Sequence, residues 1–345
     1  MQNTREQNGK KREADKNNYQ ELKEKLITLR QARKQKKEEL GAKYISLSPE
    51  SSIEFFPHPS LFNSEILLST MWIFNGFVIN LGKLRMLVDP AAELLSRVPS
   101  VESLMGLNTL FISHSHVDHY ASAEVALEFM RIPSKKKQIQ IIASHRAFRD
   151  KVINNYHAGI IPGFGNVERI TLRHNNPFSL YDVALTPIKL YHSISGTFGF
   201  ILEYKDIKIG YISDTGYTKV FKTTTGRAYK AGEGTYEGDF AEILSKHAWI
   251  KKHFSQVDYL VANINDLLFN KHSQYHLTGF DLIDILKGSR VKKCFLQHIH
   301  PIDLLNSDSA RLTAQYITEK SGVSVSTIPT AGLKLQLPTD SEPEK

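Results

Sequence analysis

The sequence predicts an α/β protein built as a layered sandwich, with helices outside mixed sheets. From about Glu54 onward, short apolar runs are separated by turns. The first runs follow one another as hairpins do, whereas later runs are separated by helical segments. This mixture is typical of helices packed on mixed sheets. A chain of 345 residues can bury a large core, in one large domain or two ordinary ones.

The expected elements follow in chain order. Strands are expected at Trp72–Asn80, Arg85–Val88, Thr109–Ser113, Gln138–Ala143, Val183–Leu190, Phe198–Tyr204, Ile207–Ser213, Tyr259–Asn263 and Lys293–Gln297, with two more at Val323–Ile328 and Lys334–Leu337. Helices are expected at Ala91–Arg97, Ser122–Arg131, Arg146–Asn155, Phe240–His253, Gly279–Leu286 and Ser309–Ser321. The stretch Tyr217–Glu237 shows no clear periodicity, so we expect a loop or an insertion, a kind of segment that often acts as a functional lid.

The basic charge is concentrated at the N-terminus. Residues 1–44 hold 13 Lys and Arg against 7 Asp and Glu, a net charge of +6, out of a total of +8. Residues 19–40 are rich in helix formers and predict a helix with Leu22, Leu26 and Leu29 on one face. This helix is expected to dock on the body, to self-associate, or to act as an electrostatic arm for nucleic acid or another anion. We divide the chain into a basic, partly disordered and helical extension (1–46), a main domain (47–337) and a flexible tail (338–345).

Cysteine usage and hydropathy exclude several classes of protein. Cys294 is the only cysteine, which excludes a disulfide scaffold and any multi-cysteine zinc or iron–sulfur site and fits a reducing compartment. No apolar run approaches the roughly 18 residues of a membrane span, and the N-terminus lacks the apolar region of a secretory signal. These features predict a soluble, cytoplasmic protein.

The segment that carries chemistry is SHSHVDH, which follows the strand expected at Thr109–Ser113. It places four side chains that can bind a metal within six positions: His114, His116, Asp118 and His119. In an extended chain His114 and His116 point to the same side, because side chains alternate with a period of two. An isolated histidine is usually a surface or core residue. This density at a strand end instead indicates a metal site, and it can serve two adjacent ions.

SHSHVDH resembles the HxHxDH signature of the metallo-β-lactamase-fold hydrolases. Further landmarks of that superfamily occur in the same order. Asp89 ends the strand MLVDP, His192 follows ALTPIKLY, Asp214 lies in ISDTG and His298 ends CFLQH. The resemblance covers roughly residues 72–301 and implies a four-layered αββα sandwich. Because Asp214 stands where common β-lactamases of this superfamily have Cys or His, it argues against antibiotic hydrolysis.

The resemblance also implies a site for two divalent ions. The implied ligands are His114, His116 and His192 for one ion, Asp118, His119 and His298 for the other, and Asp214 for both. Asp89 is expected to lie next to the ligands, and His300 is an alternative to His298. The three imidazoles favour zinc, although manganese, iron or cobalt fits the same donors.

Two such ions, about 3.5–4 Å apart, can hold a shared water and stabilise it as a bridging hydroxide nucleophile. His276, in YHLTGFD, is similar to the loop histidine with which the RNase Z-like phosphodiesterase branch assists the leaving group, and His272 is a weaker alternative. We therefore expect Asp118 and His276 to act in catalysis. The loop reads HLT rather than HST, and no long arm for gripping transfer RNA can be identified.

The expected function is a phosphodiesterase acting on a nucleotide, a cyclic nucleotide or a nucleic-acid phosphodiester. The alternative is a lactonase-like or phospholipid-type hydrolase of the same fold. Four basic residues in the stretch 217–237 are suited to phosphate contact, although charged loop residues are more often simply solvated: Lys219, Lys222, Arg227 and Lys230. A homodimer is left open, because many members of this superfamily are dimers.

Overall fold

The computed structural model describes residues 24–25, 27–28, 31–32, 35, 51–56, 76–92, 94, 98, 100–133, 137–233, 235–298, 307–328 and 332–338. The chain divides into two compact units, one formed by residues 1–47 with 132–134 and the other by the rest. In the first unit, the described residues between Glu24 and Gln35 are helical, inside the helix predicted at 19–40. Leu22, Leu26 and Leu29 lie outside the described residues. The domain boundaries at 46 and 337 stay predictions.

The first sheet of the second unit has seven strands in the order β18-β1-β2-β3-β4-β5-β6. Their bounds are β1 (Ser52–Phe55), β2 (Phe77–Leu81), β3 (Leu84–Val88), β4 (Thr109–Ile112), β5 (Gln138–Ala143), β6 (Asn166–Thr171) and β18 (Leu333–Gln336). The strands from β18 to β3 pair antiparallel. Those from β3 to β6 pair parallel, so the carboxyl ends of β3 and β4 lie at the same edge.

The second sheet follows the path β17-β16-β14-β10-β9-β8-β7, with β15 paired to β14. Its strands are β7 (Phe178–Leu180), β8 (Val183–Lys189), β9 (Phe198–Tyr204), β10 (Ile207–Ile212), β14 (Tyr259–Asp266), β15 (Leu277–Thr278), β16 (Lys293–Gln297) and β17 (Ser324–Thr327). The strands from β10 to β17 pair parallel, whereas β7, β8, β9 and β10 pair antiparallel with their neighbours. The carboxyl ends of β8, β10, β14 and β16 therefore share one edge.

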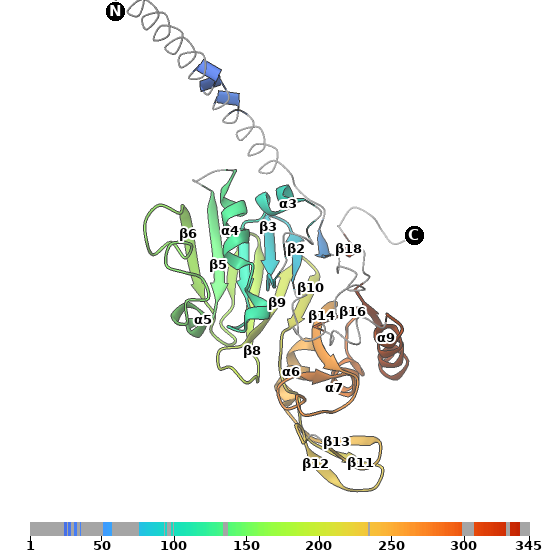
Figure 1. Cartoon of the computed structure of the whole chain (residues 1–345). Helices are drawn as coiled ribbons and strands as arrows, with labels where there is room; N and C mark the ends of the chain where they lie inside the picture. The colour runs from blue at the N-terminus through green and yellow to red at the C-terminus, as the bar shows by residue number, and fades with distance from the viewer. Residues whose placement is uncertain are drawn as a thin grey trace, which may run out of the picture. The chain divides into compact units, whose positions relative to one another are not determined.

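The two sheets pack face to face, and helices cover both outer faces (Figure 1). The first sheet is covered by α3 (Val101–Met105), α4 (Ala123–Arg131) and α5 (His145–Arg149), and the second by α6 (Ala248–Phe254), α7 (Gly279–Leu286) and α9 (Ser307–Ser321). Strand β4 shows how the sequence produces these layers. Phe111 points into the cluster between the sheets, whereas Leu110 and Ile112 join the cluster under the helices. The predicted α/β sandwich is confirmed.

Three predicted elements are wrong. Phe240–His253 is not one helix, because β13 (Phe240–Lys246) precedes α6. The stretch Tyr217–Glu237, expected as a loop or an insertion, is not a loop, because it contains β11 (Thr218–Thr223) and β12 (Ala228–Lys230), which form a separate sheet with β13. The helix predicted at Arg146–Asn155 ends at Arg149, two residues before Lys151 takes a left-handed φ of 54°.

The error in β13 has a physical cause. Register shifts interrupt its pairing with β11, so the half-buried residues Phe240, Ile243 and Lys246 recur every three positions, as on a helix. Burial of Phe221, Tyr229 and Phe269 in one aromatic cluster stabilises this small sheet. Strands β1, β6, β7 and β15 were not predicted. Most of the helix predicted at 91–97 lies outside the described residues.

Two expectations from composition can be compared with the structure. Cys294 is fully buried in β16, as expected of a small apolar residue. In the described part of the chain, no helix combines the length and the apolar character that a membrane span requires.

Candidate metal centre

Polar side chains gather where strands of both sheets end. Asp89 directly follows β3, and His298 directly follows β16. His114, His192 and Asp214 come within three residues after β4, β8 and β10. Because the carboxyl ends of these strands lie at one edge of each sheet, the two packed sheets bring the five residues together. The short 3₁₀ helix η1 (Val117–His119) turns the chain after β4 and adds Asp118 and His119.

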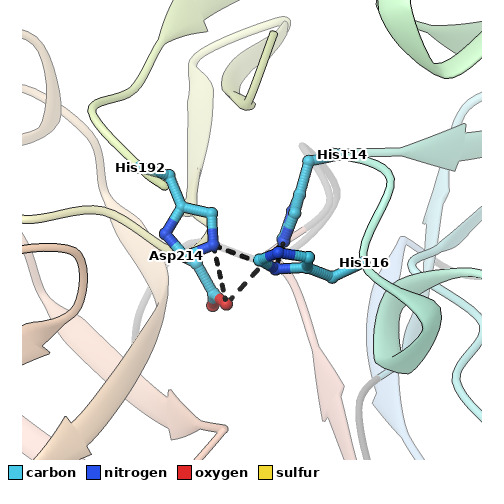
Figure 2. A group of neighbouring side chains, drawn as sticks. All are labelled: His114, His116, His192 and Asp214. Carbon is cyan, nitrogen blue, oxygen red and sulfur yellow. Dashed lines mark hydrogen bonds and ion pairs between the residues drawn. The ribbon is translucent and has the colours of Figure 1, made fainter. Parts of the chain in front are cut away.

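The first group consists of His114, His116, His192 and Asp214, whose side chains point toward one another (Figure 2). His116 Nδ1 lies 3.0 Å from His114 Nε2 and 3.1 Å from His192 Nε2. Asp214 Oδ2 lies 3.9 Å from each of these two Nε2 atoms. Two nitrogen ligands of a tetrahedral ion, each about 2.0–2.1 Å from it, are separated by about 3.3 Å. The spacing of the imidazole nitrogens therefore fits a metal ion.

Hydrogen bonds on the far side of two rings fix which nitrogen faces the centre. His192 Nδ1 lies 2.9 Å from the Tyr275 carbonyl oxygen, which can only accept, so Nδ1 carries the proton. Ser113 Oγ donates to Asp89 and therefore accepts from His114 Nδ1 at 2.9 Å. Both Nε2 atoms are thus unprotonated and face inward. Burial lowers the pKa of His114 and His192, so both rings are neutral at neutral pH, as metal ligands must be.

The second group consists of Asp118, His119, His298 and Asp214. His298 Nε2 lies 3.1 Å from Asp118 Oδ2 and 3.4 Å from Asp214 Oδ2. His119 Nε2 lies 3.5 Å from Asp118 Oδ2 and 3.4 Å from Asp214 Oδ2. The two groups thus share one oxygen atom, Asp214 Oδ2.

Asp214 is held in place by its surroundings and is nearly fully buried. Its Oδ1 accepts a hydrogen bond of 2.9 Å from Asn263 Nδ2, which leaves Oδ2 facing the histidines. Burial opposes a charge on this carboxyl group, yet His298, His119 and His276 hold its pKa well below the usual range. An ionised carboxylate between two sets of imidazoles is a donor arrangement suited to two cations.

Asp89 belongs to neither group and forms a hub behind them. Its Oδ1 accepts from the Ser113 backbone N–H at 2.7 Å, and its Oδ2 accepts from Ser113 Oγ at 2.7 Å. Oδ2 also accepts from Tyr211 at 2.7 Å and lies 2.8 Å from His119 Nδ1. Asp89 therefore orients His119 so that its Nε2 faces the second group, in the way that carboxylates orient metal-bound histidines. The φ of 43° at Asp89 is strained for a residue with a side chain, as is common at functional sites.

His276 lies beside both groups, in the segment 267–276 between β14 and β15. Its Nδ1 is 3.7 Å from Asp214 Oδ2, and its ring stacks on that of His298 at 5.7 Å. Its side chain is 18 % exposed, so the ring borders the centre and still reaches solvent. The alternative residue His272 is exposed, with its ring 6.5 Å from that of His276. His300 lies outside the described residues.

A family model supplies the identification. The model described as "Beta-lactamase superfamily domain" matches residues 84–299, more than half of the chain. The chain belongs to this superfamily. Its fold family consists of metal-dependent hydrolases, and the two His and Asp groups lie inside the matched region.

Individual proteins share sequence or fold with this chain. The uncharacterized protein MJ1374 of Methanocaldococcus jannaschii is 25 % identical over 278 residues, covering 76 % of this chain and 86 % of that protein. The metallo-β-lactamase-fold protein YhfI of Bacillus subtilis superposes with a TM-score of 0.55 at 15 % identity, over 83 % of this chain and 99 % of YhfI. The short form of human tRNase Z superposes with a TM-score of 0.52 at 13 % identity, over 83 % of this chain and all of that chain. At these identities the structural matches show a shared fold.

Several residues that hold the two His and Asp groups in place were not singled out from the sequence. They include Tyr211, Asn263 and the backbone carbonyl of Tyr275, which contact Asp89, Asp214 and His192. Tyr211 and Asn263 stand among apolar neighbours in the strands expected at Ile207–Ser213 and Tyr259–Asn263, so each was a detectable signal, because a buried polar group requires a partner. The Tyr275 carbonyl leaves no such signal, because every residue has a carbonyl group.

Proposed function

We propose that the protein is a binuclear metal-dependent phosphodiesterase. The proposed ligands are His114, His116 and His192 for one ion, Asp118, His119 and His298 for the other, and Asp214 for both. Support comes from the two groups of inward-facing donors that share Asp214 Oδ2. Bound divalent ions would supply an activated water and neutralise negative charge on the substrate oxygens. The preponderance of imidazole favours zinc, with manganese or iron as alternatives.

The observation that favours a phosphodiester over other substrates is His276. It is an imidazole outside both donor groups, yet it faces the oxygen that they share. A group in this position can protonate the oxygen that leaves when a phosphodiester is cleaved, which is needed because an alkoxide is a poor leaving group. Burial lowers the pKa of His276 to about 3, so the free ring is neutral and must take up a proton as the substrate binds before it can donate one to the leaving oxygen. An anionic phosphodiester beside the ring favours its protonated form, whereas a neutral lactone does not.

Two proteins of the same fold act on phosphorus esters or anhydrides, which supports the same chemistry here. Besides tRNase Z, a diphosphatase of the PhnP family superposes with a TM-score of 0.52 at 13 % identity, over 83 % of this chain and 98 % of that chain. No transfer-RNA arm is proposed, because the stretch 217–237 holds β11 and β12 of a short three-stranded sheet with β13.

If His276 protonates the leaving group, the fall in kcat caused by its replacement should depend on how much the leaving group needs a proton. In His276→Gln we expect the kcat for a dinucleotide to fall by about 10²–10⁴-fold, the usual contribution of a general acid. The kcat for bis-p-nitrophenyl phosphate should fall far less, because p-nitrophenolate leaves without a proton. Steady-state kinetics on both substrates, with bound metal quantified, provides the measurement.

The matched control is His272→Gln, the same change four residues earlier, which should leave the kcat for both substrates unchanged. An equal loss on both substrates in His276→Gln would contradict the leaving-group role. Turnover of a lactone by the unchanged protein, with no turnover of either diester, would contradict the phosphodiesterase and favour a lactonase-like hydrolase.

Gly216 is expected to hold the His276 segment at its position. A Cβ atom built on Gly216 would lie 2.0 Å from the Gln274 carbonyl oxygen and 3.2 Å from the Tyr275 nitrogen. In Gly216→Ala the segment must therefore move, and displacement of a reacting group by about 1 Å can lower a rate about 10²-fold. We expect kcat to fall to this extent. Gly226→Ala is the control, since its Cβ would meet nothing within 4 Å and the strain from its φ of 85° stays in the turn between β11 and β12. Equal kcat values in the two variants would contradict the prediction.

A further inference from the structure

Four aromatic rings form a row that leads outward from the metal centre, here called the aromatic row: Tyr275, Tyr191, His247 and Trp249. The rings of Tyr275 and Tyr191 stack with centroids 6.0 Å apart and planes inclined by 28°. Tyr191 and His247 follow at 4.5 Å and 31°, and Trp249 meets His247 edge-on at 4.5 Å. The row therefore connects three separate segments of the chain.

The inner end of the aromatic row is continuous with the metal centre. Tyr191 directly precedes His192, and Tyr275 directly precedes His276. The Tyr275 carbonyl oxygen also lies 2.9 Å from His192 Nδ1. A substrate whose phosphate reaches the centre consequently has the aromatic row beside it.

The outer part of the row faces solvent. Tyr191 is 45 % exposed and Trp249 is 37 % exposed, so a ligand in solution can reach both rings. The Tyr191 hydroxyl makes no hydrogen bond to the described residues, so the ring is not held in place by its polar end. Trp249 is held in orientation, because its Nε1 donates to the Lys189 carbonyl oxygen at 3.3 Å.

The charge near the row suits a phosphate. Lys219, exposed on β11, is close enough to act on His247 electrostatically. Burial, with this lysine, lowers the pKa of His247 to about 4, so the ring within the row is neutral and can take part in stacking. Exposed aromatic rings beside a cation are the combination that single-stranded nucleic acids bind through base stacking and phosphate contact.

We propose that the aromatic row is a base-stacking subsite, in which Tyr191 and Trp249 hold the nucleobase next to the scissile phosphodiester. This inference rests on the proposed function and narrows its substrate to a nucleotide-based diester. A free cyclic nucleotide and the end of a single-stranded nucleic acid share this chemistry.

Tryptophan fluorescence tests the subsite directly. The chain has two tryptophans, so Trp72→Phe leaves Trp249 as the only one. The probe is a thymidine tetranucleotide with phosphorothioate linkages, which resist hydrolysis. The comparison is an abasic tetramer with the same linkages and charge. We expect the thymidine probe to quench Trp249 and to bind about tenfold more tightly than the abasic one.

The matched substitutions are Tyr191→Leu and Tyr181→Leu in the Trp72→Phe protein. Both tyrosines are exposed and flank β8 at opposite ends. Tyr191→Leu should weaken binding of the thymidine probe about tenfold and leave the abasic probe unchanged, whereas Tyr181→Leu should change neither. Equal affinity for the two probes, or equal affinities in the two variants, would overturn the subsite.

Different results would overturn the phosphodiesterase activity and the base-stacking subsite. Base-dependent quenching without turnover of bis-p-nitrophenyl phosphate by the unchanged protein would overturn the phosphodiesterase and keep the subsite. Turnover without quenching by any base-bearing probe would overturn the subsite alone. A parallel titration with a cyclic mononucleotide distinguishes the two ligand types. An affinity comparable to that of the thymidine tetramer assigns the subsite to free nucleotides, whereas a weaker affinity assigns it to a nucleic-acid strand.

Discussion

Replacement of Asp214 by alanine is expected to abolish hydrolysis of bis-p-nitrophenyl phosphate, with a fall in kcat of at least about a thousandfold. Asp214 Oδ2 lies within 4 Å of nitrogens from both proposed ligand groups, so its removal affects both ions. It also removes the only carboxylate of the first group and one of the two carboxylates of the second. Bound metal per chain should fall together with kcat. Elemental analysis of the purified variant and steady-state kinetics measure the two quantities.

Asp206→Ala is the matched control for this variant. Asp206 is exposed in the turn that precedes β10, at the opposite end of the strand from Asp214. Its loss removes the same side chain without touching the centre, so metal content and kcat should be unchanged. Circular dichroism verifies that both variants are folded. An Asp214→Ala protein that kept its metal and its turnover would refute the shared-ligand arrangement.

Asp89→Ala is expected to have the largest effect on stability. It removes the acceptor of four contacts, from the Ser113 backbone N–H, the Ser113 and Tyr211 hydroxyls and His119 Nδ1. Leaving these buried polar groups without an acceptor costs about 3–5 kcal/mol of unfolding free energy. Loss of the carboxylate behind His119 should also weaken metal binding about 10–100-fold. Urea unfolding of the metal-free protein and metal titration measure the two effects.

Tyr211→Phe is a milder change, because it removes one of the four contacts of Asp89 and the 3.3 Å hydrogen bond that the Tyr211 hydroxyl accepts from Asn263. We expect a loss of about 1–2 kcal/mol of unfolding free energy, the net contribution of these two hydrogen bonds. Asp89 and Tyr211 come from β3 and β10, so their contact joins the two sheets. If Asp89→Ala unfolded at the same urea concentration as the unchanged protein, Asp89 and its four contacts would not stabilise the fold.

The sandwich could be predicted from the sequence because its core strands are short apolar runs between clear turns. The bounds predicted for β5, β9 and β16 agree with the structure. The residues singled out as ligands follow strand ends within three residues or lie in the short turn and helix η1 after β4, and the fold brings them together in two groups. Their role as ligands stays a prediction.

Features that depend on contacts between distant segments could not be predicted. The bulged pairing of β11 with β13 gives a helix-like spacing that only the neighbouring strand explains. The contact between Tyr211 and Asp89 joins residues 122 positions apart. The aromatic row likewise arises from three segments, none of which carries a motif of its own.

The most direct test of the account is hydrolysis of bis-p-nitrophenyl phosphate by the purified full-length chain, with bound metal quantified and chelator-treated protein as the control. A binuclear phosphodiesterase predicts about two metal ions per chain. Turnover should disappear with the chelator and return when metal is restored. Protein that binds no metal, or turnover that the chelator leaves unchanged, would contradict the assignment of the metal centre.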